Sequence, residues 1–127
     1  MKTETVDDAV LETWTVDEVA DAFDRDEIVL IDVRTAQEYM FEHIEGTLLM
    51  PMSFFRADKL PGQSEKRIVF HCGSGVRSER VARAAIAIGM DRIAHMGGGM
   101  AAWKEANKPH ISTNMATGAP QRVGDNG

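Results

Sequence analysis

The sequence has a single cysteine, Cys72, among its 127 residues. One cysteine cannot form a disulfide within the chain, and a chain of this length needs none, because it buries roughly two thirds of the surface that it exposes when unfolded. The N-terminal residues contain no apolar stretch typical of a signal peptide. We therefore expect one folded domain in a reducing, cytoplasmic setting.

Long apolar runs and an excess of basic residues are also absent. The longest mostly apolar stretch, residues 84–90, is far shorter than the roughly 20 residues that a membrane-spanning helix requires. The net charge is −6, and residues 1–27 hold ten acidic and two basic side chains. Because neutralised phosphates supply most of the affinity for nucleic acids, we expect neither a nucleic acid nor a membrane as a partner. The oligomeric state stays open.

Strand and helix patterns alternate along the chain. Aliphatic and β-branched runs at residues 28–33 and 67–71 are typical of buried parallel strands. Shorter strands are expected at residues 47–50 and 92–96. Capping boxes at Thr15 and Thr35 predict helices that end near residues 24 and 41, and apolar spacing predicts two more, at residues 78–88 and 100–107. This order indicates an α/β domain around a mostly parallel sheet.

The domain boundaries follow from composition. Residues 1–12 read as an acidic N-terminal segment, residues 13–109 as the folded domain, and residues 110–127 as an extended or disordered tail rich in Gly, Asn, Thr, Ser and Pro. The sequence shows no internal repeat and no second domain. His43, His71 and His95 show no spacing of metal ligands, so we expect no metal and no cofactor.

Cys72 lies between the strand at residues 67–71 and the helix that follows. Gly73 and Gly75 allow successive backbone N–H groups to turn toward one point, which makes an anion nest. The helix N-terminus near Ser78 and the guanidinium of Arg77 add positive charge. We therefore expect a lowered pKa for the Cys72 thiol. A cysteine that only packs in the core would not need two glycines, two serines and an arginine in the next six positions.

The segment Cys72-Gly73-Ser74-Gly75-Val76-Arg77-Ser78 resembles the active-site loop of the rhodanese sulfurtransferases, which in single-domain members often reads C-x-x-G-x-R-S. Other segments resemble landmarks of that family in the same order: Asp32-Val33-Arg34 with Glu38-Tyr39, His43-Ile44-Glu45-Gly46, and Gly98-Gly99-Met100-Ala101-Ala102-Trp103. Together they cover about residues 14–109. The resemblance implies a rhodanese-like, doubly wound, mostly parallel sheet with helices on both faces.

The resemblance also implies a double displacement, in which the Cys72 thiolate takes a sulfane sulfur from a small donor, thiosulfate or a persulfide, and passes it to an acceptor. The substrate would be bound by Gly73, Ser74, Gly75, Val76, Arg77 and Ser78. Asp32 and Arg34 would support the loop or form a structural ion pair. Because the chain has no second cysteine, the acceptor must be external: cyanide, a small thiol or a protein.

Two alternatives belong to other classes. The chain could be a persulfide carrier or binding partner that turns over cyanide poorly, or a cysteine phosphatase or arsenate reductase. The phosphatase signature places five residues between its cysteine and arginine, whereas four separate Cys72 from Arg77. The shorter loop makes a tighter nest, which suits one sulfur atom better than a tetrahedral phosphoryl group. Family members that use thiosulfate well often have a cation inside the loop, which Gly73 and Ser74 do not provide.

Overall fold

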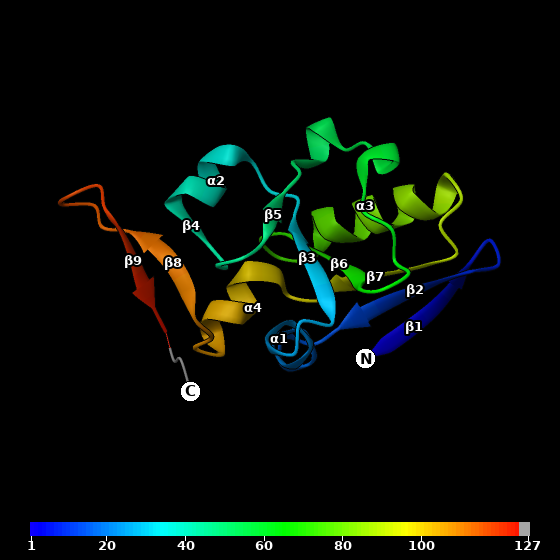
Figure 1. Ribbon diagram of the computed structural model, residues 1–127, viewed down its shortest axis with the longest axis horizontal. Coiled ribbons are helices and arrows are strands. Elements are labelled where there is room, and N and C mark those ends of the chain that lie inside the picture. Colours follow the sequence, from blue (N-terminus) through cyan, green and yellow to red (C-terminus); the bar gives the residue numbers. More distant parts are fainter. Residues whose placement is uncertain (125–127) are drawn as a thin grey trace.

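The computed structural model describes residues 1–124 and is built around a six-stranded sheet (Figure 1). The strand order is β1-β2-β7-β6-β3-β5, and every neighbouring pair is parallel except β1 with β2. The strands are β1 (Lys2–Val6), β2 (Ala9–Trp14), β3 (Ile28–Asp32), β5 (Leu48–Leu49), β6 (Arg67–His71) and β7 (Arg92–Met96). The mostly parallel α/β sheet expected from the sequence is confirmed.

Helices cover both faces of this sheet, as the resemblance implied. They are α1 (Val16–Asp24), α2 (Ala36–Phe41), α3 (Val76–Ala87) and α4 (Gly99–Glu105), with short 3-10 turns η1 (Met52–Phe54) and η2 (Ala57–Lys59) between β5 and β6. Thr15 and Thr35 both form the capping boxes that the sequence predicted. No helix within the described part of the chain is long and apolar enough to cross a membrane.

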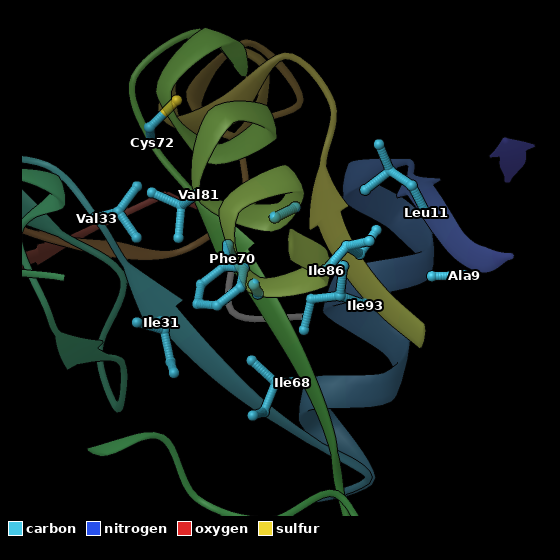
Figure 2. Close-up of a cluster of buried hydrophobic side chains, with 12 residues drawn as sticks. Ala9, Leu11, Ile31, Val33, Ile68, Phe70, Cys72, Val81, Ile86 and Ile93 are labelled. Atoms are coloured by element: carbon cyan, nitrogen blue, oxygen red, sulfur yellow. The ribbon is translucent and has the colours of Figure 1, made fainter. Parts of the chain in front are cut away.

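The core has two parts because side chains of the central strands alternate between the two faces. On the α3 face, Ile68 and Phe70 of β6 pack with Val81 and Ile86 of the helix (Figure 2). On the opposite face, Val69 lies in a cluster with side chains of α1 and α4. The strands are therefore buried on both sides, which is why they read as continuous apolar runs.

The two ends of the chain are more ordered than composition suggested. Residues 1–12 were expected to lie outside the domain, but β1 and β2 form a hairpin in the main sheet, and Ala9 and Leu11 are buried in the core. At the other end, β8 (His110–Thr113) and β9 (Pro120–Val123) pair with each other and with β4 (Glu42–His43) in a second, antiparallel sheet. Residues 125–127 of the expected tail lie outside the described residues.

Glu12 explains how an acidic N-terminal segment joins the core. Its carboxylate is fully buried. It accepts hydrogen bonds from Arg67 of β6, from Arg92 of β7 and from Trp14. Burial alone would raise the pKa of Glu12, but these hydrogen bonds outweigh it, so the net shift of the pKa is downward. A buried carboxylate needs such partners, because desolvation without them costs several kcal/mol.

We predict that Glu12→Ala destabilises the domain by about 3 kcal/mol, because it leaves the side chains of Arg67 and Arg92 without the anion between them. Chemical denaturation followed by circular dichroism measures this loss. Glu4→Ala is the matched control: Glu4 pairs with Arg83 at the surface, where water screens the pair, and its removal should cost much less than that of Glu12. Equal losses for the two variants would contradict the structural role of Glu12.

Candidate functional site

Cys72 directly follows β6, at the carboxyl end of a central strand where ligands of α/β proteins commonly bind. Its side chain lies at one end of the α3-face cluster, near Val33 and Val81 (Figure 2). The residue is fully buried. The chain then passes through Gly75, whose positive φ of 105° is open to glycine, and enters α3 at Val76.

Backbone N–H groups converge on the Cys72 sulfur. The amides of Gly75 and Ser78 donate to Sγ at 3.1 and 3.3 Å, and the Ser78 hydroxyl oxygen lies 3.6 Å from it. Burial raises the pKa of the thiol, but hydrogen bonds from Ser78, Gly75 and Ser74 outweigh it, so the net shift is downward from the ordinary value of 9.0. The loop therefore favours the thiolate, in the direction that the sequence predicted.

The N-terminus of α4 holds the loop from behind. The amides of Met100 and Ala101 donate to the carbonyl oxygens of Cys72 and Gly73, at 2.7 and 3.0 Å. A Cβ atom on Gly99 would lie 2.4 Å from the Cys72 oxygen, so a side chain here would push α4 away from the loop. With these carbonyls directed toward α4, the amides further along the loop are free to face the sulfur.

Arg77 is directed toward a carboxylate. Its guanidinium donates two hydrogen bonds to Glu38 of α2, at 2.7 and 3.0 Å. The pair crosses the loop close to Gly73, because a Cβ on that glycine would lie 3.2 Å from Arg77 Nη2. These hydrogen bonds lower the pKa of Glu38 to about 2. The sequence predicted that Arg77 adds a full positive charge to the site; Glu38 offsets much of that charge.

Asp32 and Arg34 form a buried ion pair with each other. The Arg34 guanidinium donates to both carboxylate oxygens of Asp32 and to the backbone oxygen of Glu42. The Asp32 carboxylate also lies 3.6 Å from Nε2 of buried His71. Burial lowers the pKa of His71, against the opposing charge of Asp32, and so favours the neutral imidazole. The geometry matches the structural ion pair that was one of the two expectations for Asp32 and Arg34.

The remaining loop residues line its outer surface. The side chain of Val76 is exposed, and Ser74 is exposed as well. Together with Gly75 they border a hollow of about 400 Å³, whose other wall includes Thr13 and Arg80. The hollow offers room for a small molecule beside the loop. The structure thus brings the whole segment from Cys72 to Ser78 into one site, whereas Asp32 and Arg34 contact other partners.

Sequence reasoning missed two contributors to the site. Glu38 was noted only as part of a motif, and its pairing with Arg77 joins residues 39 positions apart. His95 was read as a strand residue, but it is buried beside the loop and bonds to the Ser78 hydroxyl. The capping box of Thr35 and Glu38 fixes where α2 begins, yet no local pattern shows which cation lies opposite.

Comparison with known proteins gives a consistent result. The model of the "Rhodanese-like domain" family matches residues 15–106. The chain is 34% identical over 92 residues to an uncharacterized protein of Synechocystis sp., covering 72% of this chain and 51% of that protein. It is 33% identical over 88 residues to the "Probable adenylyltransferase/sulfurtransferase MoeZ" of Mycobacterium tuberculosis, covering 66% of this chain and 22% of that protein. The chain thus spans about half the length of the first relative and about a fifth of the length of the second.

A solved structure shows the same fold. The rhodanese-like domain of the Anabaena sp. Alr3790 protein superposes with a TM-score of 0.71 at 19% identity, and the match covers 91% of this chain and 89% of that domain. At this identity the likeness concerns the arrangement of strands and helices.

We predict that Gly99→Ala destabilises the protein by about 2 kcal/mol or more, because the new Cβ meets the Cys72 carbonyl at a backbone position that already has a positive φ. Cys72 of the variant should also be alkylated more slowly at neutral pH, because the loop amides would no longer point at the sulfur and stabilise the thiolate. Gly62→Ala is the control, since a Cβ there has nothing within 4 Å. Indistinguishable stability and alkylation of the two variants would contradict the contact between α4 and the loop.

The ion pair of Glu38 and Arg77 predicts a pH-dependent stability difference. The folded-state pKa of Glu38, about 2, lies below its ordinary value of 4.5. The ion pair therefore stabilises the fold fully at pH values above 4.5, and this stabilisation is lost as the pH falls toward 2. The melting temperature of Glu38→Gln should therefore lie below that of the wild type at neutral pH, and the gap should close in acid. Glu105→Gln, at an exposed carboxylate, is the control. A gap that persists unchanged near pH 2 would refute the assignment.

Proposed function

Since the chain belongs to the rhodanese-like domain family, we propose that it is a sulfurtransferase that carries sulfane sulfur on Cys72. The observation that carries the proposal is the convergence of the Gly75 and Ser78 amides on the Cys72 sulfur. Hydrogen bonds of this kind stabilise the thiolate, the form of cysteine that attacks electrophilic sulfur. The sulfurtransferase name of the mycobacterial relative agrees with this chemistry over the span that the two chains share.

In the first step, the Cys72 thiolate attacks the outer sulfur of a donor, either thiosulfate or a persulfide. A new S–S bond forms at Sγ, the S–S bond of the donor breaks, and the donor leaves with the electron pair as sulfite or as a thiolate. The product is a Cys72 persulfide whose negative charge lies on the outer sulfur. Amides of the loop and the N-terminus of α3 are suited to stabilise this anion.

In the second step, an acceptor attacks the outer sulfur and Cys72 leaves as a thiolate. Cyanide would give thiocyanate, and a thiolate would give a new persulfide. Because Cys72 is the only cysteine, the acceptor comes from outside the chain. The hollow beside Ser74 and Val76 has the size for a small thiol or for the tip of a protein side chain. A reducing compartment such as the cytoplasm suits a free, reactive thiol.

The spacing within the loop favours sulfur over phosphoryl transfer. With four residues between Cys72 and Arg77, the amides of Gly75 and Ser78 already donate to Sγ itself. Arg77, which would have to bind phosphoryl oxygens, donates to Glu38. A persulfide carrier that hands sulfur only to a protein acceptor uses the same first step, so the two versions of the proposal differ in their acceptor.

The test is intact-mass analysis after incubation with thiosulfate or with a thiol persulfide. We expect the wild type to gain the mass of one sulfur atom and to lose it on addition of cyanide or a thiol, while Cys72→Ser gains nothing. Loss to a protein acceptor but slow loss to cyanide would identify a carrier. No gain by the wild type from either donor, or equal gain by Cys72→Ser, would refute the proposal. Turnover of a phosphotyrosine mimic that depends on Cys72 would instead identify a phosphatase.

A further inference from the structure

A line of three polar side chains, from Ser78, His95 and Thr13, leads from the Cys72 sulfur across the sheet. The Ser78 hydroxyl oxygen lies 3.6 Å from Sγ and 2.9 Å from Nδ1 of His95 on β7. The other ring nitrogen of His95, Nε2, lies 3.1 Å from the hydroxyl of Thr13 on β2. Ser78 is fully buried and His95 is 3% exposed. Three elements and the loop therefore meet in one chain of hydrogen bonds.

The orientation of the Ser78 hydroxyl decides what this chain does to the sulfur. The hydroxyl has one hydrogen and three neighbours that can accept it: Sγ, the carbonyl oxygen of Gly75 at 3.2 Å, and Nδ1 of His95. If Nδ1 lacked a proton, the hydroxyl hydrogen would be drawn to this nearest neighbour and away from the sulfur. If Nδ1 carries the proton, the imidazole becomes the donor and the hydroxyl hydrogen is left to the Gly75 carbonyl and the sulfur, of which a charged thiolate is the stronger acceptor.

Thr13 completes the second arrangement, because its hydroxyl can donate as well as accept. With the proton on Nδ1, Nε2 is an acceptor, and the Thr13 hydroxyl can donate to it. We propose that His95 is a positioning residue: its neutral imidazole donates from Nδ1 to Ser78 and thereby turns the Ser78 hydroxyl toward the Cys72 thiolate. This inference deepens the proposed function and rests on it, because the thiolate is the group that accepts the sulfane sulfur.

Burial favours the neutral imidazole, and the surrounding charges largely offset one another. Burial lowers the pKa of His95, the negative charge of Glu79 opposes this, and Arg83 adds to the lowering. Arg83 is itself paired with Glu4 and Glu79. On the other side of the loop, Arg77 faces Cys72, and its charge is offset by Glu38. The thiol is therefore the group expected to titrate in this network between neutral and alkaline pH.

The test is the pH dependence of Cys72 alkylation by iodoacetamide in single and double variants. Ser78→Ala should raise the midpoint by about one pH unit, the worth of one hydrogen bond to a charged group. His95→Phe should raise it by a similar amount, and the double variant should raise it no further, because both changes remove the same hydrogen bond. His95→Asn should keep the midpoint near that of the wild type, because its amide nitrogen can occupy the place of Nδ1.

A purely structural role for His95 would give a different pattern. His110→Phe, which replaces another buried histidine outside this network, is the matched control and should leave the midpoint unchanged. If His95→Phe fails to fold, His95→Gln takes its place, because its amide reaches the Nε2 side and leaves the Nδ1 position empty. An unchanged midpoint in the His95 variant that folds, additive shifts in the double variant, or no rescue by His95→Asn would each overturn the inference.

The same experiment separates this inference from the proposed function. Alkylation reports the thiolate alone and needs no sulfur donor. A wild type that gains sulfur, together with His95 variants of unchanged midpoint, would leave the proposed function standing and remove the role of His95. A wild type that gains no sulfur, together with the expected shifts of the midpoint, would refute the proposed function and leave the role of His95 standing.

Discussion

The site depends on two hydrogen bonds that join helix α4 to the loop after β6. The amides of Met100 and Ala101 hold the carbonyl groups of Cys72 and Gly73 on the far side of the loop. A peptide unit whose oxygen is fixed on one side constrains how the chain continues, and the amides of Gly75 and Ser78 then reach the sulfur. Gly99 is required at this junction because a side chain would collide with the Cys72 carbonyl. Thus the C-terminal motif shapes a loop that lies almost thirty positions earlier, and the two motifs form one unit.

The thiolate is stabilised by fixed dipoles more than by a cation. Burial of Cys72 disfavours the charged form, and the aimed N–H groups of the loop reverse that effect. Arg77 lies above the loop, but its guanidinium is committed to Glu38, which offsets its charge. Dipoles that are held by the fold need little reorganisation when charge moves during the reaction, whereas a flexible cation would have to follow it. The Arg77 and Glu38 pair accordingly ties α2 to the start of α3 and holds the loop in position.

The sequence predicted the parts of this arrangement that are encoded locally. The apolar run of β6, the glycines of the loop and the spacing of apolar residues in α3 lie next to Cys72, so the strand, the turn and the helix could be read in order. The hairpin of β1 and β2 could not, because β1 is mostly polar and exposed, and the apolar run of β2 is interrupted by Glu12, whose burial depends on arginines of β6 and β7. The turn at Asp7 and Asp8, both with positive φ, was the available signal for it. The partners of Arg77 and Ser78 come from distant strands and helices, and only tertiary structure joins them.

Ser78 links the resting site to the second half of the proposed cycle. In the persulfide the negative charge lies on the outer sulfur, about 2 Å beyond Sγ. The Ser78 amide, which donates to Sγ, and the Ser78 hydroxyl, 3.6 Å away, then face a sulfur with little charge. As an acceptor takes the outer sulfur, the charge returns to Sγ, and both interactions strengthen. They therefore act on Cys72 as a leaving group and favour release of sulfur over its retention. A hydroxyl kept toward Sγ by His95 would speed discharge of the persulfide more than its formation, because the thiolate is the starting state of one step and the product of the other.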